Sequence, residues 1–338
     1  SAQLNAVAYD SVDDKFVAVG NSGTIIYSAD GVTWTVAAAA ATFNNVTYSS
    51  TLDLYIAVGD SGVIYTSPDQ AVWTKRTSGT TANFKRVACN SSVIVAVGAS
   101  GAIYTSADGV TWTSRTSGTA YPLYGVAFGN SLFVACGNNG STGTNVILTS
   151  PDGITWTSRT VTGAGPSILT AVGFHASTNT FAAGGTGGFV ITSADGITWA
   201  NSTGVAYGGT TGGMSYKSDG TYVLAGGYGS ISYGPLDSMI YVQVTTFDVN
   251  IYFTGTAYSS SLGLFCAVGT GGMIYTSPTG ATWTSRTSGT ANALLSIKWD
   301  ATLGLFITTG TNVILTSPDG ITWTSRLATG GSLVLGYI

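Results

Sequence analysis

One sequence unit recurs along the whole chain of 338 residues and constrains the fold more than any other feature. In its first copy the unit reads LNAVAY from Leu4, KFVAVG from Lys15, GTIIYSADG from Gly23 and VTWT from Val32. The residues that lead the copies lie 39 to 46 positions apart: Leu4, Phe43, Phe84, Leu123, Leu169, a weak one near Thr211, Phe253 and Leu294. A period of about 40 residues is typical of a propeller blade with four strands.

Each unit holds four short apolar segments separated by Gly, Asn, Asp and Ser, which favour tight hairpin turns. No segment has the 3.6-residue period of a helix over a useful length. The chain has 47 Gly and no Glu, and it is rich in Thr, Val and Tyr, which favour strands. The sequence therefore predicts an all-β fold, a β-propeller of about eight four-stranded blades.

The sixth unit is degenerate, and seven blades are the alternative if it is not a blade. The interval from Trp199 to Trp283 is 84 residues, twice a normal period, which favours a blade that has lost the repeat motif over a linker. Its expected strands are Met214 to Tyr216, Tyr222 to Gly226, Ser230 to Tyr233 and Met239 to Val244.

We expect residues 1–331 to form one propeller domain, with blades starting near residues 4, 43, 84, 123, 169, 211, 253 and 294. Residues 332–338 resemble another first strand, although the N-terminus already supplies one. This segment is expected to be a C-terminal strand that either closes the ring on the first blade or contacts a partner.

The turn between the third and fourth segments carries the motif S-x-D-G-x-T-W. Its aspartates are Asp30, Asp69, Asp108, Asp152, Asp195 and Asp319, and its tryptophans are Trp34, Trp73, Trp112, Trp156, Trp199, Trp283 and Trp323. Gln70 replaces the glycine in one copy, and Thr279 replaces the aspartate in another. An Asp side chain can accept hydrogen bonds from backbone N–H groups of its turn, and Gly permits positive φ. The Trp is expected to fill the space between blades, where a Trp→Ala change costs about 3–5 kcal/mol.

These motif residues resemble the Asp-box, or BNR, propellers, which include sialidases, photosystem II assembly factors and repeat proteins of phage tails. The resemblance covers essentially the whole chain, and the repeat propellers of bacteriophage tail and virion proteins are the most similar. The usual box has one more residue between the Asp and the Gly. The resemblance implies a propeller fold, and the fold alone does not imply an activity because it hosts many functions.

The residues that an enzyme of this kind needs are mostly missing, so we expect no catalytic residues, no metal and no cofactor. A sialidase uses a Tyr–Glu pair and clustered arginines, but all 15 acidic residues here are Asp. One Arg follows the Trp in each of five copies, at Arg76, Arg115, Arg159, Arg286 and Arg326, and charge on an outer edge strand discourages aggregation. The single histidine, His175, is expected to be a surface residue of a turn. Cys89, Cys136 and Cys266 occupy apolar strand positions and are expected to be free buried thiols.

A ligand site is expected at the end opposite the Asp-box turns, which carries the ligand in related propellers. Irregular residues fall in its loops: Tyr121, Asn138, Asn139, Asn145, Tyr207, Tyr228 and Asp248. Tyr rings stack on sugar faces and Asn amides bond hydroxyl groups, so these residues favour carbohydrate. Ordinary loop variation is the alternative.

The charge pattern limits the partners. A net charge of −4 without a basic cluster argues against nucleic acid, and no apolar run reaches the length of a membrane span. The leading hypothesis is a non-enzymatic structural or binding propeller of a virion or extracellular assembly. It would be present in many copies and contact other structural proteins or a host-surface glycan. Alternatives are a secreted or cell-surface lectin, an assembly factor and a sialidase-like glycosidase.

Overall fold

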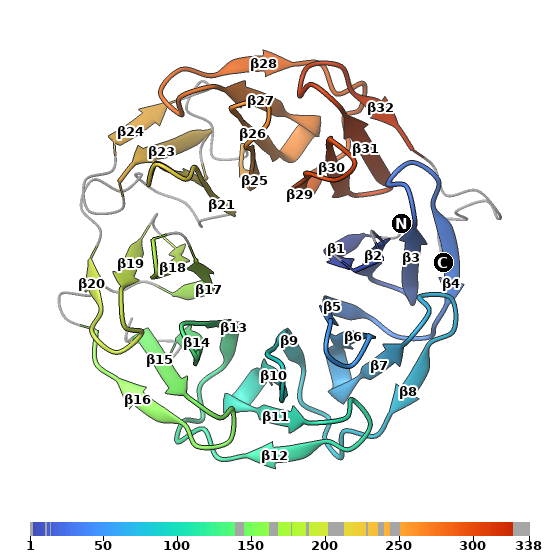
Figure 1. The fold of residues 1–338 in the computed structure, drawn as a ribbon, viewed down its shortest axis with the longest axis vertical. Coiled ribbons are helices and arrows are strands. Elements are labelled where there is room, and N and C mark those ends of the chain that lie inside the picture. Colours follow the sequence, from blue (N-terminus) through green and yellow to red (C-terminus); the bar gives the residue numbers. More distant parts are fainter. Residues whose placement is uncertain are drawn as a thin grey trace.

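The chain folds into a ring of eight four-stranded sheets, each built from consecutive strands (Figure 1). The computed structural model describes residues 3–10, 12–13, 15–138, 145–161, 168–176, 178–186, 189–201, 213–227, 229–235, 240–243 and 251–326. The prediction of an eight-bladed all-β propeller is confirmed, and the seven-bladed alternative is excluded. The sixth unit forms a complete blade with the sheet order β21-β22-β23-β24.

The innermost strands are β1 (Leu4–Asp10), β5 (Phe43–Ser49), β9 (Phe84–Cys89), β13 (Leu123–Gly129), β17 (Leu169–His175), β21 (Gly213–Tyr216), β25 (Phe253–Ser259) and β29 (Leu294–Asp300). The second strands are β2 (Lys15–Gly20), β6 (Leu54–Gly59), β10 (Ile94–Gly98), β14 (Leu132–Asn138), β18 (Thr180–Gly185), β22 (Tyr222–Ala225), β26 (Leu264–Gly269) and β30 (Leu305–Gly310).

The third strands are β3 (Thr24–Ser28), β7 (Ile64–Ser67), β11 (Ile103–Ser106), β15 (Asn145–Ser150), β19 (Val190–Ser193), β23 (Ser230–Gly234), β27 (Ile274–Ser277) and β31 (Val313–Ser317). The outer strands are β4 (Thr35–Ala38), β8 (Thr74–Arg76), β12 (Thr113–Arg115), β16 (Thr157–Arg159), β20 (Ala200–Asn201), β24 (Ile240–Gln243), β28 (Thr284–Arg286) and β32 (Thr324–Ser325). Short 3-10 turns η1 (Asp60–Gly62), η2 (Ala99–Gly101) and η4 (Thr270–Gly272) follow three of the second strands. Within the described residues, no helix is long and apolar enough to span a membrane.

All strand pairs within a blade are antiparallel, which divides the connections between two ends of the ring. Turns from first to second and from third to fourth strands lie at one end, which we call the box end. Turns from second to third strands and the links between blades lie at the other, which we call the loop end. The Asp-box turns and the loops with the expected ligand residues are therefore on opposite ends.

The hydrophobic core lies between blades. One cluster combines Phe16, Ala18 and Trp34 of the first blade with Ile307 and Ile314 of the last. Comparable clusters join the other neighbouring blades, and they contain the buried members of the apolar repeat. Burial of apolar surface is the main force that stabilises such a ring.

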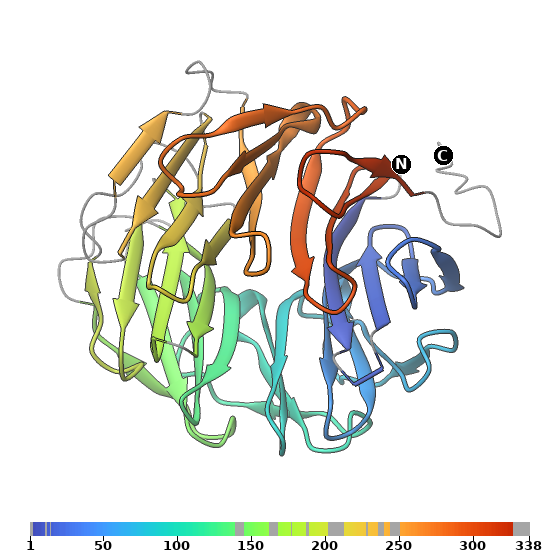
Figure 2. The ribbon, with the colours of Figure 1, turned by 45° about the horizontal axis from the view of Figure 1, so that its top comes forward.

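The ring closes between two complete blades, which lie side by side in Figure 2. Tyr9 Oη donates to Thr302 Oγ1 at 3.3 Å across this contact, and Gln3 forms an isolated bridge with Thr311. The first blade takes all four of its strands from the N-terminal region, in the order β1-β2-β3-β4. The expected C-terminal strand at 332–338 lies outside the described residues.

Candidate functional site

In six of the seven box turns, one carboxylate closes the turn. In the third blade, Asp108 Oδ1 accepts hydrogen bonds from the backbone N–H groups of Val110 at 2.8 Å and Thr111 at 2.7 Å. Ser106 Oγ donates to the same oxygen at 2.9 Å and accepts from Gly109 N at 2.8 Å. The N–H groups of Thr111 and Val110 hold the pKa of Asp108 down at about 2. The carboxylate is therefore ionised, and its Oδ1 atom accepts the hydrogen bonds that close the turn.

The Gly and Trp of the box fasten one blade to the preceding one. Gly109 has φ +72, a left-handed conformation that favours glycine, and a Cβ there would lie 2.4 Å from the end of the Leu54 side chain of the second blade, which would have to move. Trp112 Nε1 donates to the Gly109 carbonyl at 3.3 Å, and its ring packs with Ile56 and Val58 of the second blade. The box end is thus tied together around the ring by repeated contacts.

Two boxes deviate from the motif, and both keep the turn. Thr279 accepts from Ala281 N at 3.2 Å through its hydroxyl, in place of a carboxylate. Gln70 occupies the glycine position with φ +68, a left-handed conformation that is costly for a residue with a Cβ.

The loop end is held by side chains at β-bulges of the innermost strands. A register shift at the second residue of β5 places Asn44, whose Nδ2 donates to Asp60 Oδ1 at 2.8 Å and to the Phe84 carbonyl of the next blade at 2.7 Å. Asn5 makes the corresponding bonds to Asn21 and Phe43. Bulges commonly re-aim a side chain in this way. These links between blades were not predicted, and the recurring polar second residue was the signal for them.

Of the residues expected to bind a ligand, the structure describes three. Tyr121 is 45% exposed in the link between β12 and β13, and its N–H donates to Thr119 Oγ1 at 3.1 Å. Asn138 and Asn145 face each other in the ladder between β14 and β15 and are buried. The Asn145 amide has no hydrogen-bond partner among the described residues. Asn139, Tyr207, Tyr228 and Asp248 lie outside the described residues.

His175 is buried, so the prediction of a surface turn residue is wrong. It is the last residue of β17 and is 4% exposed, because Tyr216 and Tyr222 of the next blade cover it. Its Nδ1 lies 2.7 Å from Tyr222 Oη and 2.7 Å from Thr178 Oγ1. Burial lowers the pKa of His175, so the imidazole is neutral. It fastens the fifth blade to the sixth.

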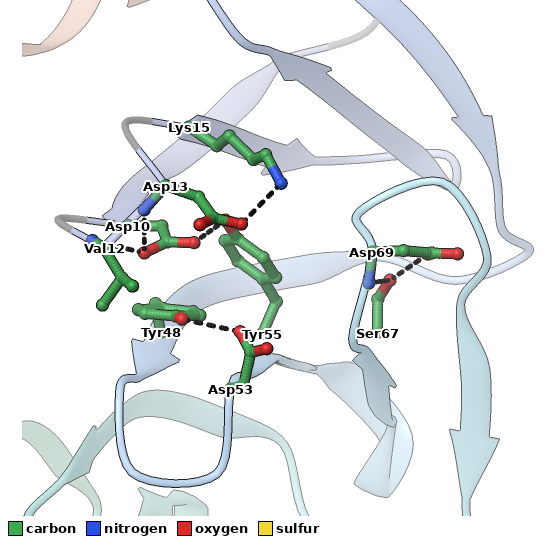
Figure 3. A network of polar contacts seen from close by, with 9 residues as sticks. All are labelled: Asp10, Val12, Asp13, Lys15, Tyr48, Asp53, Tyr55, Ser67 and Asp69. Carbon is green, nitrogen blue, oxygen red and sulfur yellow. Dashed lines mark hydrogen bonds and ion pairs between the residues drawn. The ribbon is translucent and has the colours of Figure 1, made fainter.

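Asp10 occupies the same position in the first blade and makes the same kind of contact (Figure 3). This carboxylate is 1% exposed and accepts from Tyr55 Oη of the second blade at 2.8 Å and from Val12 N at 2.8 Å. Nearby, Tyr48 Oη donates to Asp53 Oδ1 at 2.8 Å. Tyr55 and Tyr222 stand where other blades have Phe or Ile. Each tyrosine hydroxyl therefore meets a polar partner at the end of the preceding blade's first strand.

The repeated arginines lie on separate blades and do not converge. In each of the five, Nε donates to a Thr hydroxyl of the third strand of the same blade, at 2.7 to 2.9 Å. Arg115 thus bonds Thr105, which is 2% exposed. The predicted protection against edge-to-edge association is compatible with this bond. The pairing of Arg with Thr was not predicted from the sequence, although its signal was there: each Arg follows its Thr by ten residues.

The described residues contain no group of three or more His, Cys, Asp or Glu that could hold a metal ion. Cys136 and Cys266 are buried free thiols, and Cys89 is half-buried. Burial raises the pKa of the Cys136 thiol to about 12, so it is protonated and packs as a small apolar group.

The comparisons with known proteins agree with the architecture. No protein-family model matches the chain, and none of the curated proteins matches its sequence. Among solved structures, YCF48 from Cyanidioschyzon merolae is 19% identical with a TM-score of 0.60, over 81% of this chain and 94% of that one. YCF48 bound to D1 peptide is 17% identical with a TM-score of 0.54, over 73% and 82% of the two chains.

Propellers of other kinds are similar over a larger part of the chain. The C-terminal WD40 domain of Sif2 has a TM-score of 0.66 at 11% identity, over 98% of this chain and 97% of that one. The computationally designed Ika8 protein has a TM-score of 0.67 at 12% identity, over 96% of both chains. At such identities the likeness shows the fold. The chain is an eight-bladed β-propeller, a class of fold that hosts many functions.

Proposed function

We propose that the chain is a non-enzymatic binding and structural propeller of the Asp-box kind, carried in many copies by a virion, such as a phage tail, or by an extracellular assembly. The observation that carries this proposal is the use of its ionisable side chains. Asp108 closes a turn, Asp10 and His175 fasten neighbouring blades, and Arg115 bonds a buried Thr. Groups engaged in this way serve the ring, which leaves the surfaces of its two ends for recognition.

The ligand of the loop end is proposed to be a host-surface glycan, with Tyr121 as one contact. Its exposed ring can stack on a sugar face, and a single shallow contact of this kind binds weakly. Many copies on one particle would raise the apparent affinity by about 100-fold or more, because linked sites gain effective concentration.

The test compares the isolated chain with a multimer on host-surface polysaccharide, by surface plasmon resonance. We expect weak binding by the chain and much tighter binding by the multimer. The combined Tyr121→Ala, Tyr207→Ala and Tyr228→Ala variant should lose most of it. Tight binding that this variant retains would show that the glycan does not contact the loop end.

A second candidate is recognition of a protein segment. It is favoured by the likeness to YCF48 bound to D1 peptide, a propeller that was solved with a peptide. A glycan array and an array of peptides from the neighbouring proteins of the assembly separate the two candidates. Binding on the peptide array alone would favour protein recognition and a role like that of an assembly factor.

A further inference from the structure

The box turns present an aliphatic side chain to solvent that the turn itself does not need. Val110, Ile154, Ile197 and Ile321 follow the box glycine and are between 46% and 51% exposed. Only the backbone N–H of this position takes part in the box, as in the 2.8 Å bond from Ile154 N to Asp152 Oδ1. A polar residue would satisfy the turn equally well, so the apolar side chains call for another explanation.

Further exposed aliphatic side chains lie at the same end of the ring. Val72 is 65% exposed in the second box, and Val12, Leu52 and Leu262 are 64%, 37% and 44% exposed in turns between first and second strands. Eight of the twelve exposed large hydrophobic side chains among the described residues thus lie in turns of the box end. Scattered single exposures are normal, but here the exposed aliphatic side chains recur on seven of the eight blades at the same end of the ring, which favours an interaction surface there.

The box end also carries negative charge. The box aspartates lie within the same turns as these aliphatic side chains, and Asp108 and Asp152 are exposed. The two lysines of this end are already paired with acids: Lys15 with Asp13 at 2.7 Å, and Lys217 with Asp219 at 3.3 Å. In the part of the chain that the structure describes, no box aspartate forms a salt bridge.

A recess between the third and fourth boxes combines the two properties. This groove of about 550 Å³ is lined by Asp108, Asp152, Val93 and Ile154, and also by Arg115, whose Nε is bonded to Thr105 of its own blade. A second groove, of about 500 Å³ between the fifth and sixth blades, is lined by Asp195, Tyr222 and otherwise by Thr, Ser and Ala, so it contributes charge without large aliphatic side chains. Each groove is large enough to receive side chains of a partner.

We infer that the box end docks a basic protein surface, one that presents Lys or Arg next to aliphatic side chains. The aliphatic residues of the box turns supply apolar contact, and the adjacent carboxylates select positive charge. The same carboxylates repel the phosphates of nucleic acids and of anionic lipids. This surface is opposite the loop end, so the inference stands apart from the proposed glycan contact.

The test uses the full chain, with Val110, Ile154 and Ile197 each replaced by Ser in one variant. The probe is an immobilised peptide of alternating Leu and Lys, with a peptide of alternating Leu and Glu as its control. The chain is expected to bind the Leu–Lys peptide and not the Leu–Glu peptide, and the variant to bind about ten-fold or more weakly. Tyr252→Ser changes a residue that is 37% exposed in the link before β25 at the loop end, and it is expected to leave binding of the Leu–Lys peptide unchanged.

Equal binding of the Leu–Lys peptide by the chain and the triple variant would overturn the inference. So would self-association of the chain, seen by sedimentation velocity, that the triple variant abolishes, because the occupant would then be a second copy. The replaced side chains are exposed, so the melting temperature should stay unchanged. If it falls, the corresponding triple Thr variant, which keeps β-branching, answers the same question.

Discussion

At the residue scale, two polar contacts fasten neighbouring blades at the end of a first strand. His175 meets Tyr222, and Asp10 meets Tyr55, each over a short hydrogen bond. Both polar residues are nearly inaccessible to solvent. Their protonation and their partners should therefore influence the stability of the ring.

His175 should make stability depend on pH near neutrality. Its pKa is lowered in the folded chain, so the unfolded chain takes up a proton first as the pH falls. The contribution of neutral His175 to the free energy of unfolding is present above the ordinary histidine pKa of about 6.5 and is lost as the pH falls below it. Urea unfolding between pH 8 and pH 5 should show this loss, and His175→Gln should flatten the dependence in that range. An unchanged profile for the variant would assign the dependence to another group.

Replacing Tyr55 by Phe should destabilise the chain by about 1–2 kcal/mol, because the buried Asp10 carboxylate loses one donor. The matched control is Tyr48→Phe, which removes an exposed bond to Asp53 and should cost about 0.5 kcal/mol or less. Urea unfolding measures both. Equal effects of the two changes would contradict a special role for the buried contact.

At the element scale, the Asp box is the turn that sets the ends of the third and fourth strands. Asp108→Ala should lower the melting temperature, because two solvent-exposed backbone N–H groups lose their acceptor at a cost of about 0.5–1.5 kcal/mol each. Binding of the glycan at the loop end should weaken only as far as stability does. Selective loss of glycan binding at an unchanged melting temperature would show a direct role of the box in that recognition.

The seventh blade offers the converse change. Thr279 stands where other boxes have Asp, and its hydroxyl accepts one backbone N–H bond at 3.2 Å. Thr279→Asp should raise the stability by about 0.5–1 kcal/mol, since a carboxylate is the stronger acceptor. Differential scanning calorimetry is the measurement, and a lower melting temperature would contradict this account of the box.

The strands and blades could be predicted from the sequence because apolar spacing and turn residues repeat with little change. Even the sixth blade, which has no Trp box, was located by the doubled interval between Trp199 and Trp283. The contacts between blades could not be read in the same way. His175 and Tyr222 are 47 positions apart and meet only through the ring, so the position of His175 alone suggested a surface turn.

At the scale of the whole molecule, the ring has two different ends, and side chains link neighbouring blades at both of them. Asn44 and Asn5 link blades at the loop end, while the boxes and their tryptophans link them at the box end. Most of the exposed aliphatic residues lie in turns of the box end, where the sequence predicted no contact. The exposed Tyr121 remains the described candidate at the loop end. Two recognition surfaces on one ring, as we propose, would suit a component of an assembly.

The central claim is that this propeller binds and does not catalyse, and turnover is its most direct test. The purified chain should be incubated with host-surface polysaccharide and with fluorogenic glycosides, and the release of reducing ends or fluorophore measured. We predict binding of the polysaccharide without release above the buffer level. Release that survives purification and disappears on the Asp195→Asn change would contradict the claim.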